Sequence, residues 1–183
     1  LSNESFDVKH QSYLVIQYFL HIFKKLDVSD IKCVATAVLR DHPRAREFTD
    51  YIKDKYDFEI RVISGEEEAR LTAKGLMSGI SDCIGIAVDL GGGSLELVEV
   101  DNGNIGKLES LELGTKIITT RNITNKNDII SIIASKFESN TYKNLYLIGG
   151  ALRFICRLYI DITEYPIKNL HNLEIPTAEF SFF

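Results

Sequence analysis

The chain has 183 residues, 45% of them hydrophobic, which is enough apolar material for one large or two small domains with cores of their own. Its net charge of −5 provides no broad cationic surface and argues against a general nucleic-acid binder, so any phosphate site must be local. No stretch approaches the roughly 18 apolar residues of a membrane span, and no signal-peptide pattern is present, so the cytoplasm is the expected compartment.

The three cysteines, Cys33, Cys83 and Cys156, are far apart in the sequence and lie in apolar contexts. They are therefore expected to be buried free thiols rather than disulfides or metal ligands. The sequence starts at Leu1 and its only methionine is Met77, which suggests a fragment of a longer product.

The first third of the chain shows an α/β alternation. Hydrophobic residues recur at helical spacing over residues 2–26, and residues 31–35 predict a buried strand. Pro43 stands where a first helical residue would be, which predicts a helix from 43 to about 56, and residues 58–63 predict a second strand. This order implies parallel strands joined by crossover helices.

Arg40 is expected in the loop after the first strand, at the edge where α/β sheets place their ligands. Its guanidinium group could hold a phosphate with two hydrogen bonds. Alternatively, Arg40 could be a surface residue that pairs with Asp41, and spacing alone favours this pair.

The run that begins at Ser64 predicts the start of another helix, with Ser64 as the N-cap. Glu67, three residues later, completes a capping box. Glu66 and Arg70 are four residues apart and are expected to form a surface ion pair. Glu68 is left without a local structural role, and its carboxylate could act as a general base toward a water molecule.

The most informative stretch runs from Ile84 to Val100. An apolar strand ends in Asp89, three glycines and Ser94 follow, and an alternating strand leads away. Glycines would allow positive φ there and would let consecutive amides approach a ligand, as in a backbone nest that cradles phosphate oxygens. The alternative is an ordinary β-hairpin whose glycines serve only the turn.

The remaining chain continues the pattern. Residues 101–104 predict a second hairpin turn, residues 105–113 a returning strand, and residues 128–137 a helix. A strand over residues 145–148 then runs into Gly149-Gly150. The helix that starts at these glycines could bind an anion at its N-terminus, or the glycines could only allow close packing of helix on strand.

Three of these segments together resemble the exopolyphosphatase and guanosine pentaphosphate phosphohydrolase (Ppx/GppA) family of the actin, sugar-kinase and Hsp70 ATPase superfamily. The family patterns A-T-x-x-x-R, S-G-x-E-E-A-R-L and D-x-G-G-G-S-x-E are met in order at residues 35–40, 64–71 and 89–96. The resemblance extends from about Leu1 to the last residues.

The resemblance implies an α/β fold of two ribonuclease-H-like lobes of the actin-like ATPase superfamily, with a cleft between them and the first lobe incomplete. Residues 1–65 would form the C-terminal part of domain I. Residues 66–183 would form domain II, the domain with the glycine loop, which could be truncated at its C-terminal end.

The resemblance also implies roles for individual residues. Glu68 matches the family's catalytic glutamate. Asp89 and Glu96 would hold Mg²⁺, the ion expected where hard carboxylates are the ligands. Gly149 and Gly150 could line the cleft. The predicted phosphate-binding residues are Arg40, Gly91, Gly92, Gly93 and Ser94.

The implied activity is Mg²⁺-dependent removal of the terminal phosphate from inorganic polyphosphate or guanosine pentaphosphate (pppGpp), with Glu68 orienting or deprotonating the water. No nucleic-acid or membrane partner is expected, and a homodimer is common in the resembling family. Two other classes stay open. One is an ATP-dependent kinase of the same superfamily, and the other is a module that binds phosphate or a nucleotide without turnover.

Two departures from the family pattern bear on activity. The family's first phosphate loop, D-x-G-S-N-S, has no counterpart in this sequence, so the isolated chain could be inactive. Leu95 stands where the family usually has threonine, which removes a hydroxyl that could touch phosphate.

Overall fold

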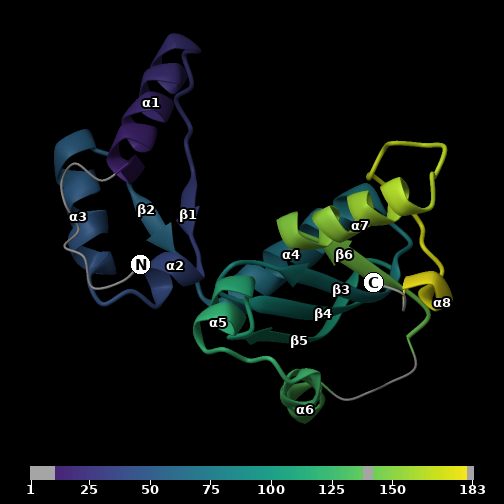
Figure 1. The fold of residues 1–183 in the computed structure, drawn as a ribbon. Helices are drawn as coiled ribbons and strands as arrows, with labels where there is room; N and C mark the ends of the chain where they lie inside the picture. The colour runs from purple at the N-terminus through teal and green to yellow at the C-terminus, as the bar shows by residue number, and fades with distance from the viewer. Residues whose placement is uncertain (1–10, 138–141, 181–183) are drawn as a thin grey trace. The chain divides into compact units, whose positions relative to one another are not determined.

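The computed structural model describes residues 11–137 and 142–180. The chain forms two compact units, Leu1–Ile63 and Ser64–Phe183. Each of them combines helices with a sheet (Figure 1). The division falls close to the sequence-based boundary between residues 65 and 66.

The first unit is built around two parallel strands with Val34 opposite Arg61. Its core contains Tyr13, Phe48 and Ile52. The parallel pairing confirms the predicted α/β alternation, and the part of the predicted first helix before residue 11 lies outside the described residues. The elements are α1 (Gln11–Lys25), β1 (Cys33–Ala35), α2 (Ala37–Arg40), α3 (Ala45–Tyr56) and β2 (Ile60–Val62).

Two local predictions for this unit are wrong. The helix expected to begin at Pro43 begins at Ala45, because a turn at His42 comes first. The N–H of Arg44 donates to His42 Nδ1 over 3.1 Å, and the N–H of Ala45 donates to the His42 carbonyl over 3.0 Å. Arg40 is not in a loop but ends the one-turn helix α2, since its N–H donates to the Thr36 carbonyl over 3.0 Å.

The second unit contains a four-stranded sheet in the order β5-β4-β3-β6. Strands β3, β4 and β5 form the predicted antiparallel meander, and β6 pairs in parallel with β3. The elements are α4 (Gly65–Gly79), β3 (Ile84–Leu90), β4 (Leu95–Asp101), β5 (Asn104–Leu111), α5 (Thr115–Thr120), α6 (Lys126–Lys136), β6 (Leu145–Ile148), α7 (Gly150–Ile162) and α8 (Thr177–Phe180).

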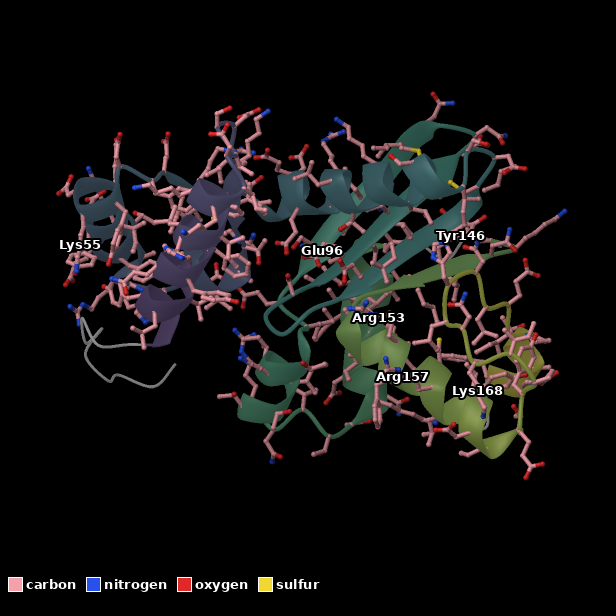
Figure 2. The ribbon with its side chains drawn as sticks, turned by 90° about the horizontal axis from the view of Figure 1, so that it is seen from above. Lys55, Glu96, Tyr146, Arg153, Arg157 and Lys168 are labelled. Carbon is pink, nitrogen blue, oxygen red and sulfur yellow. The ribbon has the colours of Figure 1, made fainter. Side chains whose placement is uncertain are left out.

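The sheet carries a separate hydrophobic cluster on each face. Successive side chains of a strand point to opposite faces, so Ala87 and Val98 pack with Ala73 of α4, whereas Ile86 and Leu97 belong to the other cluster. In Figure 2 the strands lie between α4 and the yellow-green α7. Helix α4 therefore covers one face of the sheet. Side chains that lie on this face at the carboxyl end of β3 are next to the first turns of α4.

Helix α4 begins as the sequence predicts. The Ser64 hydroxyl accepts the N–H of Glu67 over 3.1 Å, which confirms the N-cap. Arg70 and Glu66 form the expected surface ion pair at 2.9 Å. This leaves Glu68 on a different side of the first turn from the ion pair.

The three cysteines are free thiols, of which Cys83 is buried and Cys33 and Cys156 are half-buried. The prediction that all three thiols are buried is therefore confirmed only for Cys83. Over residues 11–137 and 142–180, the helices are too short or too polar to cross a membrane.

Candidate active site

The glycine loop, residues 91–94, joins β3 to β4 and is held against the start of α5. A Cβ on Gly114 would lie 2.4 Å from the backbone of Gly92 and Gly93, so only glycine permits this approach. Three backbone hydrogen bonds make the contact: Thr115 N–H to Gly91 O (3.0 Å), Lys116 N–H to Gly92 O (2.9 Å) and Gly114 N–H to Gly93 O (3.3 Å). All three glycine carbonyls are therefore directed toward α5.

This anchoring fixes the direction of the loop amides. In a trans peptide, the C=O of one residue and the N–H of the next point in opposite directions. The N–H groups of Gly92, Gly93 and Ser94 therefore point away from α5. In the described part of the chain these three amides donate no hydrogen bond. A row of consecutive unpaired amides is a typical binding surface for an anion.

The fold itself does not require glycine at the first two loop positions. Gly91, Gly92 and Gly93 all lack positive φ, so that expectation is wrong. The reason is that the Gly91 carbonyl accepts the N–H of Thr115 over 3.0 Å instead of the N–H of Ser94, so the loop is not the hydrogen-bonded hairpin turn that needs positive φ. A Cβ on Gly91 or Gly92 would make only ordinary contacts, the nearest at 3.5 Å. Because the fold would accept a side chain at Gly91 and Gly92, these glycines favour a site where a ligand approaches the backbone over a plain hairpin turn.

Three carboxylates border the same end of the sheet. Asp89 and Glu96 are opposite each other in the β3-β4 register and therefore share the face that α4 covers, where Glu68 stands in the first turns of that helix. Thr72 Oγ1 donates to Asp89 Oδ2 over 3.4 Å. Ser110 Oγ, from β5, donates to Glu96 Oε1 over 2.9 Å. Figure 2 labels Glu96 at this end of the sheet.

Burial and mutual repulsion perturb two of these carboxylates. Burial raises the pKa of Asp89, and the charge of Glu68 raises it further, whereas the charge of Arg153 lowers it. Burial also raises the pKa of Glu96, which is only 1% exposed, and the charges of Glu68 and Asp89 add to this effect. These shifts disfavour the ionised form of both carboxyl groups, and a bound cation would stabilise that form.

The residues fit a magnesium ion that binds together with its substrate. Among the described residues, no three His, Cys, Asp or Glu side chains form a ready-made metal cage. Mg²⁺ commonly binds through one or two carboxylates and completes its shell with water and phosphate oxygens. Asp89 is the accessible member of the predicted pair, and the nearly inaccessible Glu96 stands directly opposite it on the neighbouring strand.

Gly149 and Gly150 lie at the same carboxyl edge, because Ile148 is opposite Asp89 in the parallel register of β6 and β3. Gly149 has a φ of 95°, and a Cβ there would lie 2.6 Å from Asp89 Oδ1, so the fold itself requires this glycine. A Cβ on Gly150 would meet nothing within 4 Å. Arg153 lies in the first turn of α7 (Figure 2), and its charge lowers the pKa of Asp89.

Arg40 belongs to the first unit and has partners within it. Its Nη1 donates to the Ile63 carbonyl over 3.1 Å, and its Nε lies 3.7 Å from Asp41 Oδ1. The predicted surface pair with Asp41 is therefore present, and the predicted contact with phosphate stays a prediction. Leu95, in place of the usual threonine, packs in the cluster on the face opposite to Asp89.

Sequence reasoning did not single out two residues of this region, Thr72 and Lys116. Thr72 could have been found, since it follows Glu68 by one helical turn and so shares its side of α4. Lys116 lies against the loop, with its Cδ 3.5 Å from the position of a Cβ on Gly92. No local signal links it to a loop so far upstream.

Comparison with known proteins gives a consistent result. The model of the Ppx/GppA phosphatase family matches residues 3–183. An exopolyphosphatase-like protein of known structure is similar, with 25% identity, a TM-score of 0.72, and coverage of 81% of this chain and 54% of that one. The Aquifex aeolicus member of the Ppx/GppA family has 20% identity, a TM-score of 0.67 and coverage of 86% and 54%. An exopolyphosphatase from Cytophaga hutchinsonii has 20% identity, a TM-score of 0.71 and coverage of 85% and 55%. The chain thus spans about half the length of these relatives.

Proposed function

Because the chain belongs to the Ppx/GppA phosphatase family and has its actin-like α/β fold, we propose that it carries the phosphate-binding half of a Mg²⁺-dependent phosphohydrolase. The proposed reaction is removal of the terminal phosphate from inorganic polyphosphate or pppGpp. The observation that carries the proposal is the row of three unpaired amides at residues 92–94, in a loop that follows directly on the carboxylate-bearing edge of the sheet. The relatives named as exopolyphosphatases make polyphosphate the first substrate to test.

Transfer of a phosphoryl group to water needs positioning and charge neutralisation more than covalent chemistry. The amides of Gly92, Gly93 and Ser94 would hold the non-bridging oxygens of the terminal phosphate. The carbonyls of the same three peptide groups, those of Gly91, Gly92 and Gly93, are already bonded to residues 114–116, so these donors need little reorganisation when the substrate arrives.

Glu68 is the proposed group that orients or deprotonates the attacking water. It is half-buried and interacts electrostatically with Asp89 and Glu96, whereas Glu66 is engaged with Arg70 at the surface. General base catalysis of this kind commonly contributes about 10²–10⁴ in rate.

Asp89 and Glu96 would hold Mg²⁺, with Asp89 as the more accessible ligand. When bound, the ion supplies neutralisation of the charge on the phosphate oxygens. Without it, a phosphate at the loop would be repelled by the three carboxylates, so binding should depend strongly on Mg²⁺.

The test is phosphate release from polyphosphate and from pppGpp, with and without Mg²⁺. It should use this chain and the chain with any flanking residues that its gene encodes, each beside its Glu68→Gln variant. Mg²⁺-dependent release that disappears in the variant supports the proposal. Binding without release by either protein would favour a phosphate-binding module, and transfer of phosphate from ATP to a small acceptor would favour a kinase.

A further inference from the structure

Lys116, in the first turn of α5, runs alongside the glycine loop. Its Cγ, Cδ and Cε lie 3.7, 3.5 and 3.7 Å from the position of a Cβ on Gly92, so the methylene stem passes this residue along its length. The base of the side chain is fixed, because the Lys116 N–H donates to the Gly92 carbonyl over 2.9 Å. The stem therefore carries the ammonium group past the loop rather than away from it.

The ammonium group of Lys116 has no structural partner to explain its position. Lys116 is exposed and forms no ion pair with any residue in the described part of the chain. The nearest carboxylate upstream in the sequence, Glu112, is paired with Arg121 at 2.6 Å. A lysine that packs on a glycine and leaves its charge free is well suited to bind an anion at that glycine.

The distribution of charge at this end of the sheet also supports a role for Lys116 in binding an anion. A polyphosphate brings several negative charges to a place that already holds Glu68, Asp89 and Glu96. Arg153 supplies a positive charge beside Asp89. Lys116 supplies another beside Gly92.

We propose that Lys116 is a phosphate-binding residue, whose ammonium group contacts the same phosphate that the amides of Gly92, Gly93 and Ser94 hold. This inference rests on the proposed function and deepens it, because it adds to the site a phosphate-binding residue that the family resemblance did not indicate. A linear inorganic polyphosphate is the expected ligand class, because it offers several charged oxygens within reach of one flexible side chain.

The first experiment measures binding of tripolyphosphate in the presence of Mg²⁺ by titration calorimetry. Lys116→Met keeps the stem that packs on Gly92 and removes the charge, so we expect affinity to fall about tenfold. Lys116→Arg should restore most of it. Lys126→Met, at the start of α6, makes the same change of charge away from the loop and should leave affinity unchanged.

Equal affinity for wild type and Lys116→Met overturns the assignment of Lys116 and leaves the proposed function intact. A similar loss in Lys126→Met also overturns it, because the effect would then be one of net charge. Failure of the wild type to bind tripolyphosphate overturns both proposals.

A second measurement uses the wild-type chain and so does not depend on how a variant folds. Lysines are acetylated at limiting reagent with and without tripolyphosphate, and the modified positions are quantified by mass spectrometry. We expect tripolyphosphate to protect Lys116 at least fivefold more than Lys126. Equal protection of the two lysines would contradict the proposal.

Discussion

Replacing Gly92 with alanine is expected to preserve the fold while it weakens phosphate binding. The nearest contacts of a Cβ there would be with the Lys116 stem, at 3.5 Å and beyond, and the backbone has no positive φ to disfavour an L residue. At such positions Gly→Ala raises the free energy of unfolding by about 0.4–1 kcal/mol, because it restricts the unfolded chain. The melting temperature should therefore rise by about 1–4 °C.

The affinity for tripolyphosphate should change in the opposite direction. The new methyl group narrows the approach to the amides of Gly92 and Gly93. A hydrogen bond from an amide to a charged oxygen contributes about 1.5–3 kcal/mol. Loss of one such bond corresponds to binding about 10- to 150-fold weaker, which titration calorimetry can resolve.

Gly114→Ala is the contrasting variant, because it should lose stability where Gly92→Ala gains it. Its Cβ would lie 2.4 Å from the loop backbone, so the loop and α5 must separate. The three hydrogen bonds between them, at about 1 kcal/mol each, would be lost, and urea unfolding should show destabilisation of about 3 kcal/mol. The reasoning is refuted if Gly92→Ala binds tripolyphosphate as tightly as wild type, or if Gly114→Ala is as stable as wild type.

Three further predictions concern the carboxylates and the cap of α4. Glu68→Gln removes basicity but not size, so phosphate release should fall by about 10²–10⁴-fold while tripolyphosphate still binds, and an unchanged rate would exclude Glu68 from the mechanism. Burial raises the pKa of Glu96 in the folded protein above its ordinary 4.5. The folded state therefore keeps Glu96 protonated to a higher pH than the unfolded state does, and the wild type loses stability as the pH rises from 4.5 through the folded-state pKa. Glu96→Gln should therefore gain stability relative to wild type as the pH rises above 4.5 in urea unfolding; a difference that stays constant with pH would contradict the raised pKa. Ser64→Ala removes the acceptor for the N–H of Glu67 and should cost about 1 kcal/mol, seen as a lower melting temperature, whereas an unchanged value would mean that the cap contributes little.

Features that depend on neighbouring residues were predictable from the sequence. The capping of α4 by Ser64 and the ion pair of Glu66 with Arg70 follow from spacing within one helix. The strand, loop and strand around Asp89 follow from the change between apolar and alternating runs. These features also identified Glu68 and Asp89 as carboxylates whose presence the local structure does not explain.

Features that depend on distant contacts were not predictable in this way. The direction of the loop carbonyls is set by residues 114–116, which follow the whole of β5. The requirement for glycine at Gly149 comes from the side chain of Asp89 on another strand. The expectation of positive φ in the loop failed for a related reason, since composition indicates a turn but does not show that Thr115, after β5, takes the Gly91 carbonyl that would otherwise close it.

The anchoring of the glycine loop by the start of α5 has a consequence for the order of folding. The β3-β4 hairpin is local, and hairpins form within about 1–10 microseconds. The amides of Gly92, Gly93 and Ser94 acquire their common direction only after β5 has paired and α5 has docked. The proposed capacity to bind an anion would therefore be a late product of folding. A polyphosphate would recognise only the completed unit, and would stabilise that unit by mass action without accelerating the hairpin that carries the loop.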